Sequence, residues 1–260
     1  KDWRIEAINK VEHILLTPDL KGDILVFIRS SEDGVVMCTD LHNRIKKHND
    51  IRPFCSILES RTSKEDRTYI INKVKYLSHP SMSPNKPYTR KVIMSTNVAE
   101  SSITVDGIVF VIDCGKFFEK MYFPAENANG LIDNNISKSA VTQRRGRGGR
   151  TQEGFCYHLY TKEEENKFQE HPTPDIQKSD LTSDILDIFH LDYIKNIKDV
   201  RTLLSEMIDP PTDVFISSAI HNLYAIGALT SEELDGILTP LGHAISKFRG
   251  IKPQYAKSIL

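Results

Sequence analysis

The densest group of residues that could do chemistry runs from Gln143 to Arg150 and reads Gln-Arg-Arg-Gly-Arg-Gly-Gly-Arg. A run of arginine and glycine is poor material for a core or a helix, and it is often only a basic turn exposed to water. The spacing here argues against that reading. Gln143, Arg147 and Arg150 stand at i, i+4 and i+7, which is one face of a helix. A glutamine that orients water and two guanidinium groups that bind phosphate oxygens suit phosphoryl transfer.

A second group is the segment Ser95–Gly107, which reads Ser-Thr-Asn-Val-Ala-Glu-Ser-Ser-Ile-Thr-Val-Asp-Gly. A loop rich in serine and threonine is usually only a loop with helix caps. This one starts where one apolar run, Arg90–Met94, ends, and it leads directly into the next, Gly107–Asp113. Its hydroxyl and backbone N–H groups are suited to hold phosphates or a sugar.

The elements that must position these residues are predicted by hydrophobic pattern. The runs Gly22–Ile28, Arg90–Met94, Gly107–Asp113 and Gly154–Tyr160 are strand candidates, and the first three are nearly continuous in apolarity, which is typical of parallel strands buried on both faces. Between them, Ser63–Leu77 has helical spacing and a capping pattern. The pattern predicts an α/β domain. Because ligands of such sheets collect beyond the carboxyl ends of the strands, we expect the site there.

The pattern changes after Tyr160. Helical spacing dominates in Leu181–Leu191, Val200–Met207 and Asp213–Leu229, and Leu234–Leu238 contains an Asp-Gly turn signal. Three helices followed by a hairpin predict a small winged-helix unit.

Composition sets broader limits. The chain has 260 residues, of which 39% are hydrophobic and 27% charged, and this balance supports a real core. A net charge of −1 argues against a basic coat over the whole surface. No apolar stretch approaches the roughly 20 residues that span a bilayer, and no metal site is expected. Four scattered cysteines are expected to be reduced, as in a cytoplasmic or nuclear protein: Cys38, Cys55, Cys114 and Cys156.

Together, Ser95–Gly107 and Gln143–Arg150 resemble motifs V and VI of the DEAH-box (DEAH/RHA) branch of superfamily 2 helicases. Gly22–Ile28 resembles the strand of motif IV, and Met207–Pro211 and Ile237–Gly242 resemble stretches of the family's winged-helix domain. The resemblance implies a RecA-like parallel sheet with flanking helices, followed by a small, mainly helical winged-helix domain. The implied ranges are 1–165 for the RecA-like domain, 166–250 for the winged-helix domain and 251–260 for the start of a further helical, ratchet-like domain.

The resemblance also implies roles for individual residues. Gln143, Arg147 and Arg150 match positions that contact the γ-phosphate region, and the two arginines are candidate arginine fingers. Tyr69 matches an aromatic residue that stacks on adenine, although an ordinary helix aromatic packed on the sheet explains it nearly as well. Met121–Ile136 falls where the family inserts a β-hairpin associated with strand separation. The remaining matches are Ser102, Thr104 and Asp106 for the nucleotide, and Ser95, Thr96 and Asn97 for the nucleic-acid backbone.

The sequence contains neither G-x-x-x-x-G-K-[ST] nor a DEAH box. The resemblance implies that these motifs, and the ligands of Mg²⁺, lie on a preceding RecA-like lobe, with ATP between the lobes. We therefore expect a segment of an ATP-dependent helicase that is inactive without that lobe. Family precedent favours RNA over DNA, and an activator protein is a further expected partner. Cellular and virus-encoded helicases both use this architecture. The alternative is a non-catalytic RecA-like and winged-helix scaffold that binds protein or nucleic acid.

Overall fold

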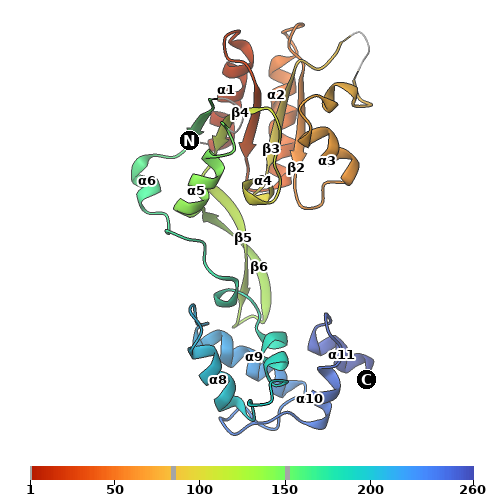
Figure 1. The fold of residues 1–260 in the computed structure, drawn as a ribbon, viewed down its shortest axis with the longest axis vertical. Helices are drawn as coiled ribbons and strands as arrows, with labels where there is room; N and C mark the ends of the chain where they lie inside the picture. Colours follow the sequence, from red (N-terminus) through yellow and green to blue (C-terminus); the bar gives the residue numbers. More distant parts are fainter. Residues whose placement is uncertain (1, 83–85, 150–152) are drawn as a thin grey trace. The chain divides into compact units, whose positions relative to one another are not determined.

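The computed structural model describes residues 2–82, 86–149 and 153–260 (Figure 1). Arg150, a predicted arginine finger, lies outside the described residues. The chain divides into two compact units. The first, which we call the sheet unit, consists of Lys1–Glu119 and Asp133–Pro172, and the second, the helical unit, consists of Lys120–Ile132 and Thr173–Leu260. The assignment of residues 120–132 to the helical unit was not expected from the sequence.

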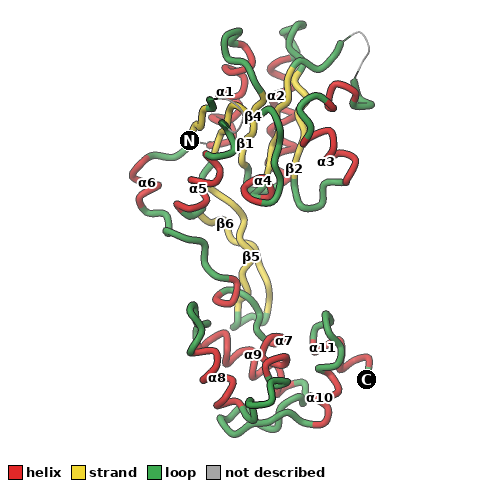
Figure 2. The backbone as a smooth tube through the Cα atoms, viewed as in Figure 1, coloured by secondary structure: helices red, strands yellow, loops and turns green. Residues whose placement is uncertain are grey.

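The sheet unit contains a five-stranded parallel sheet with the strand order β2-β3-β1-β4-β7, drawn in yellow in Figure 2. This arrangement confirms the predicted α/β class. The edge strand β2 was missed, because it begins at a proline and is only partly buried, and so lacks the continuous apolar pattern of a central strand. The strands are β1 (Asp23–Phe27), β2 (Pro53–Leu58), β3 (Arg90–Ser95), β4 (Ile108–Asp113) and β7 (Phe155–His158).

Helices cover both faces of this sheet. Successive residues of a strand point to opposite faces, so Ile24 and Val26 of β1 pack with α1 (Trp3–Leu16) and α2 (Ser31–Ile45). On the other face, Leu25 and Phe27 pack with residues of three short elements. Those elements are α3 (Lys64–Ile71), the 3-10 helix η1 (Lys75–Ser78) and α4 (Val98–Ser101).

The prediction of a single helix over Ser63–Leu77 was wrong. Helix α3 ends at Ile71, and Asn72 adopts an extended conformation. The Asn72 side-chain oxygen accepts hydrogen bonds from the backbone N–H groups of Val74 and Lys75 at 3.0 and 3.2 Å. Asparagine competes for backbone donors in this way, and the resulting turn separates α3 from η1.

The cysteines differ from the expectation that all four are reduced. Cys38 on α2 and Cys55 on β2 form a disulfide across a Cα–Cα distance of 5.8 Å. Packing of the helix against the edge strand brings the two residues within bridging range, which their positions in the sequence do not reveal. Cys114 and Cys156 are free. Burial raises the pKa of each of these thiols to about 12, so both stay protonated.

The helical unit has one hydrophobic core, built from the inward faces of its helices. The hairpin expected around Leu234–Leu238 is reduced to an isolated antiparallel bridge between Leu229 and Leu238, flanked by backbone hydrogen bonds from Thr230 to Ile237 and from Thr239 to Ala228. Thr239 caps the next helix as its position before Pro240 predicts, with its hydroxyl accepting from the Gly242 N–H at 2.9 Å. The helices are α7 (Thr182–Ile188), α8 (Ile197–Ser205), α9 (Asp213–Ala225), α10 (Pro240–Ile245) and α11 (Pro253–Ile259), preceded by η2 (Asp175–Gln177). Over the described ranges, no helix is long and apolar enough to cross a membrane.

Strands β5 (Lys116–Phe123) and β6 (Ala128–Asn135) form a separate two-stranded sheet. This hairpin lies where the resemblance placed one, at Met121–Ile136, although its first strand begins five residues earlier. After β6 the chain enters α5 (Lys138–Arg145), then β7 and α6 (Lys162–Asn166).

Candidate functional site

Helix α5 carries the first three residues of the Gln143–Arg150 segment. The helix begins at a Ser137 cap, whose hydroxyl accepts from the Ala140 N–H, and ends at Arg145. Glycine destabilises a helix, so α5 does not continue into the glycine-rich residues that follow Arg145. Arg147 therefore lies outside the helix, and the prediction that it shares a helical face with Gln143 was wrong.

The side chains of this segment differ in exposure. Gln143 and Arg145 are exposed, whereas Arg147 is half-buried and its guanidinium donates to the backbone carbonyl of Glu100. Gly148 permits a close approach to the sheet, since a Cβ there would lie 3.0 Å from the carbonyl oxygen of Val109. The side chain of Arg147 thus connects the glycine-rich turn to α4.

Arg144 is a residue that the sequence reasoning missed. Its side chain is only 1% exposed. Its Nη1 donates to Asp113 Oδ1 at 2.8 Å and its Nε donates to Glu100 Oε2 at 2.9 Å, while the guanidinium lies 4.6 Å from the Phe27 ring centroid. Glu100 belongs to the Ser95–Gly107 segment, so Arg144 joins the two segments that the sequence singled out. In the sequence, the one feature that could have indicated a buried partner for an arginine was Asp113, an aspartate at the end of an otherwise apolar strand.

The remaining hydrogen-bonding capacity of Asp113 is also used. Tyr160 Oη donates to Asp113 Oδ2 at 2.9 Å, and the Gly115 N–H donates to Oδ1 at 2.9 Å. Burial by itself lowers the pKa of Arg144, but the attraction of Asp113, helped by Glu100, outweighs it and the net shift is upward. Burial, reinforced by Asp113, raises the pKa of Tyr160. Arg144 therefore stays charged and Tyr160 stays a proton donor across the physiological pH range.

The predicted nucleic-acid residues lie at the carboxyl end of β3. Ser95 is fully buried, and its hydroxyl donates to the carbonyls of Leu58 at 3.2 Å and Thr96 at 2.9 Å. Thr96 is half-buried and Asn97 is exposed. In this conformation Thr96 and Asn97 can reach a ligand, whereas the Ser95 hydroxyl is engaged inside the protein.

The predicted nucleotide residues lie elsewhere. Asp106 is followed by Gly107, whose carbonyl accepts from the N–H of Asp23 at the start of β1. This is the amino edge of the sheet, so the candidate residue Asp106 does not lie beyond the carboxyl ends of the strands, where the sequence led us to expect the site. The reason is topological, because the segment between two parallel strands must return to the opposite edge. Ser102, Thr104 and Asp106 all have exposed positions.

Tyr69 lies close to Asp106 through the backbone, since the Asp106 N–H donates to the Ile71 carbonyl at 2.8 Å. Tyr69 is half-buried, packs against the hydrophobic cluster on that face of the sheet, and meets the His79 ring edge-on at 4.8 Å between centroids. This geometry accommodates both interpretations of Tyr69, the packed helix aromatic and the partner of a base.

A buried lysine supports this region and was also missed. Lys91 is fully buried, and its Nζ donates to the carbonyls of Ile70, Asn72 and Asp106 at 2.9, 3.0 and 2.9 Å. Burial lowers the pKa of Lys91. The ammonium group fixes the end of α3 to the end of the Ser95–Gly107 segment, which holds Asp106 beside Tyr69's helix.

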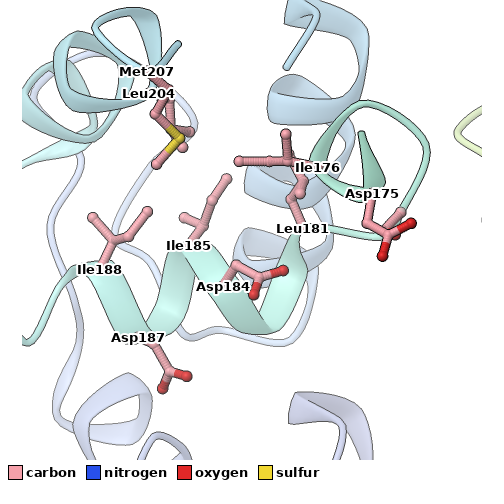
Figure 3. A pocket seen from close by; sticks show the side chains of 10 residues that line it. Asp175, Ile176, Leu181, Asp184, Ile185, Asp187, Ile188, Leu204 and Met207 are labelled. Carbon is pink, nitrogen blue, oxygen red and sulfur yellow. The ribbon is translucent and has the colours of Figure 1, made fainter. Parts of the chain in front are cut away.

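A separate cavity of about 460 Å³ lies in the helical unit (Figure 3). Burial, together with repulsion from Asp187, raises the pKa of Asp184 at its rim. An apolar floor with a carboxylate rim repels phosphates, so this cavity suits neither a nucleotide nor a nucleic-acid backbone. Its lining includes Ile176, Leu181, Ile185, Ile188, Leu204 and Met207, with Asp175, Asp184 and Asp187.

Comparison with known families agrees with this architecture. The model of the helicase conserved C-terminal domain matches residues 6–152, and that of the helicase-associated winged-helix domain (HA2) matches residues 219–249.

Individual proteins show the same similarity. The chain is 35% identical to the pre-mRNA-splicing factor ATP-dependent RNA helicase prp22 of Schizosaccharomyces pombe, over 100% of this chain and 20% of that protein. It is 37% identical to human ATP-dependent RNA helicase DHX33, over 100% of this chain and 34% of that protein. The solved structure of the Escherichia coli DExH-box NTPase HrpB matches with a TM-score of 0.78 and 25% identity, covering 99% of this chain and 28% of that one.

The chain thus spans 20% and 34% of the length of these two curated relatives. The matched domain covers strands β1 to β4, the Ser95–Gly107 segment and α5, and it includes Arg144 with its partners Glu100 and Asp113. The chain belongs to the family of the helicase conserved C-terminal domain, within the DEAH-box group of helicases.

Proposed function

We propose that the protein containing this chain is an ATP-dependent RNA helicase, in which this chain forms the second RecA-like lobe and the winged-helix domain. ATP, with Mg²⁺, would be held mainly by a preceding lobe, because the phosphate-cradling motif is absent from this sequence. The names of the relatives and the conserved domain support this proposal.

The residues present suit the nucleotide chemically. Tyr69 offers a half-buried aromatic ring for a base, and Thr104 and Asp106 offer an exposed hydroxyl and carboxylate for a sugar. Gln143 is exposed at the end of α5, and Arg147 follows it with a guanidinium group. When bound, ATP supplies the phosphoryl group whose transfer to water releases the energy for movement.

One observation carries the proposal: Arg144 ties α5 to α4 through Glu100 and to β4 through Asp113. Arg147 donates to the carbonyl of the same Glu100. If a nucleic-acid strand displaced the Ser95–Gly107 segment, Arg147 would therefore move with it. Arg147 is the arginine that we propose faces the nucleotide. This is the coupling that a motor needs between its two ligands.

At the carboxyl edge, Thr96 and Asn97 are placed to bind the backbone of the nucleic acid. Contacts of this kind position the strand but do not read its bases, so binding should be largely independent of sequence. Unwinding rates of the complete protein on matched RNA and DNA duplexes would decide between the two substrates.

Beyond RNA, we propose the protein's own N-terminal RecA-like lobe as the main partner, with an activator protein as a further one. RNA substrates place such a protein in the cytoplasm or the nucleus. A disulfide is uncommon in these compartments, so Cys38 and Cys55 are expected to be sensitive to the thiol balance there.

The test is a steady-state ATPase measurement on the complete protein with Arg147→Ala. Loss of an arginine finger lowers turnover by roughly 10³-fold or more, and we expect a loss of that order. Arg145→Ala, two residues earlier and exposed, is the matched control and should retain turnover within about twofold. Near-normal turnover in Arg147→Ala would contradict the assignment. An inactive wild-type protein would favour the scaffold alternative.

A further inference from the structure

A cavity of about 400 Å³ lies in the sheet unit, where the end of α2 meets the start of β2. Ligand-binding pockets of proteins typically have about 300–1,000 Å³, so this cavity can hold one group the size of a nucleotide. The described residues that line it include none from Ser95–Gly107 or Gln143–Arg150. The proposed function therefore leaves this cavity without a role.

The lining of the cavity is basic, and we call it the basic cavity. Lys46, Arg52 and Lys86 contribute positive charges, and His42 and His48 add two imidazole rings. The lining residues that the structure describes include no aspartate or glutamate. Because the whole chain has a net charge of only −1, this is a local concentration of positive charge. A concave surface with charge of one sign focuses the electric field and attracts ions of the opposite sign.

The positive charges of the basic cavity are not neutralised by ion pairs. Arg44, also on α2, is paired with Glu12 at 3.4 Å and with Asp40 at 2.9 Å. Within the described ranges, neither Lys46 nor Lys86 forms an ion pair of this kind. Both side chains lie at exposed positions, so their ammonium groups are available to a ligand.

The dipole of α2 explains only part of this charge. Basic residues near the end of a helix often do no more than offset the partial negative charge of its last carbonyls. That explanation covers His42 and Lys46, which lie at the end of α2. It does not cover Arg52 and Lys86, which come from two other segments of the chain and line the same cavity.

The walls of the basic cavity are held in place. The Arg52 guanidinium donates to the Lys86 carbonyl and lies 5.0 Å from the Tyr88 ring centroid. Helix α2 and strand β2, both labelled in Figure 1, are also joined by the Cys38–Cys55 disulfide. The cations therefore surround one space and do not depend on a single loop for their position.

The chemistry of the lining suits a nucleotide of an RNA strand. Lysine and arginine bind phosphate oxygens, and buried Ile45 and Pro53 add apolar surface against which a base or ribose can pack. The exposed imidazole of His42 offers a flat ring for stacking. A carboxylate of an acidic protein would use the charges but not the apolar surface and the ring.

Resting on the proposed RNA helicase function, we propose that the basic cavity is a second contact site for single-stranded RNA. It would bind a phosphate and the adjoining base of a part of the strand that lies outside the segment held by Thr96 and Asn97. Strand β2 connects the two places, since Pro53 lines the cavity and Leu58, at the other end of β2, is paired with Ser95. Five steps of about 3.3 Å make this distance about 17 Å, which one RNA strand can span.

The test measures binding of single-stranded RNAs of increasing length to the complete protein, by fluorescence anisotropy. In the double variant Lys46→Gln/Lys86→Gln, we expect the affinity for long strands to fall about tenfold. The slope of log affinity against log salt concentration should become shallower by about 1.4, because two phosphate contacts are lost. The affinity for strands too short to reach the basic cavity should not change.

The matched control removes the same charge elsewhere. Lys47→Gln/Lys21→Gln replaces two lysines that are exposed and do not line the basic cavity, and it should keep the wild-type affinity for long strands. Both double variants should keep the wild-type ATPase rate without RNA, which shows that they are folded. An equal loss of RNA affinity in the two variants would overturn the site, because the effect would then come from net charge alone.

Photo-crosslinking identifies the contact directly. A long strand that carries photoreactive uridines should crosslink to the peptide containing residues 42–53, and a short strand should not. If the wild type binds RNA and Lys46→Gln/Lys86→Gln keeps its affinity and salt slope, the second site is wrong while the proposed function stands. If the wild type binds no RNA of any length, the proposed function fails, and the second site fails with it. Loss of polyglutamate binding in the same variant, with RNA binding intact, would assign the basic cavity to an acidic protein instead.

Discussion

Two polar networks, each centred on buried side chains, join distant parts of the chain, and they use opposite chemistry. In the sheet unit, Arg144 lies between Asp113 and Glu100 as a charged cluster. In the helical unit, Tyr122 and Asn127 of the β5–β6 hairpin and Asn222 of α9 form a network that contains only neutral groups. Burying charge is costly unless each charge is paired, whereas amides and hydroxyls need only satisfied hydrogen bonds.

The difference follows from what each network supports. In the proposed function, the turn that the Arg144 cluster organises presents further guanidinium groups to phosphates, so a deep carboxylate that fixes the first arginine would also limit repulsion among its neighbours. The neutral network only holds the hairpin tip against α9, and it does this with less desolvation than buried charges would need.

The largest expected effect comes from breaking the charged network. Arg144→Ala leaves Asp113 buried without its guanidinium partner, and we expect the free energy of unfolding to fall by about 3–5 kcal/mol. Chemical denaturation, followed by a spectroscopic signal from the sheet unit, measures this loss. The neighbouring exposed arginine provides the control, since Arg145→Ala should change stability by less than about 0.5 kcal/mol. Equal effects of the two substitutions would show that the Arg144 cluster adds little to the free energy of unfolding.

Breaking the neutral network should cost less. Asn222→Ala leaves the polar groups of Tyr122 and Asn127 short of a partner, and we expect a loss of about 1–3 kcal/mol in the unfolding free energy of the helical unit. The same denaturation experiment measures it, with His221→Ala, adjacent and exposed, as the control. A loss as large as that of Arg144→Ala would remove the proposed difference between the networks.

The smallest effect concerns unpaired charge. Burial and neighbouring carboxylates raise the pKa of Asp184, so the folded protein binds this proton more tightly than the unfolded chain does. The ionised carboxylate is then a cost at neutral pH, and this cost disappears as pH falls through the raised pKa. Asp184→Asn should therefore stabilise the helical unit by about 0.5 kcal/mol at pH 7, a small value because solvent screens the site.

Thermal unfolding of this variant at pH 7 and at pH 3.5 checks the sign. The advantage of Asp184→Asn over wild type should be present at the higher pH and absent at the lower one. Asp175→Asn, whose carboxylate is almost fully exposed, should show no such dependence. A stabilisation that grows in acid would contradict the argument.

Several features could be predicted because they depend on residues close in the sequence. Apolar runs predicted four of the five strands of the main sheet, and the resemblance of the two motif segments to a known family led to the correct family. The roles of the individual site residues stay predictions. Where local signals were weak or competing, as at the edge strand β2 or the asparagine turn after α3, the sequence reading failed.

The sequence by itself determined the α/β class and the helical character of the second unit, because apolar periodicity and turn residues act locally. Only the tertiary structure decided which arginine is buried, which edge of the sheet receives Asp106, and that the hairpin tip joins the helical unit. Each of these depends on partners far apart in the chain, as Arg144 is from Glu100 or Tyr122 from Asn222. Burial and pairing follow from packing, and no short window of residues contains that information.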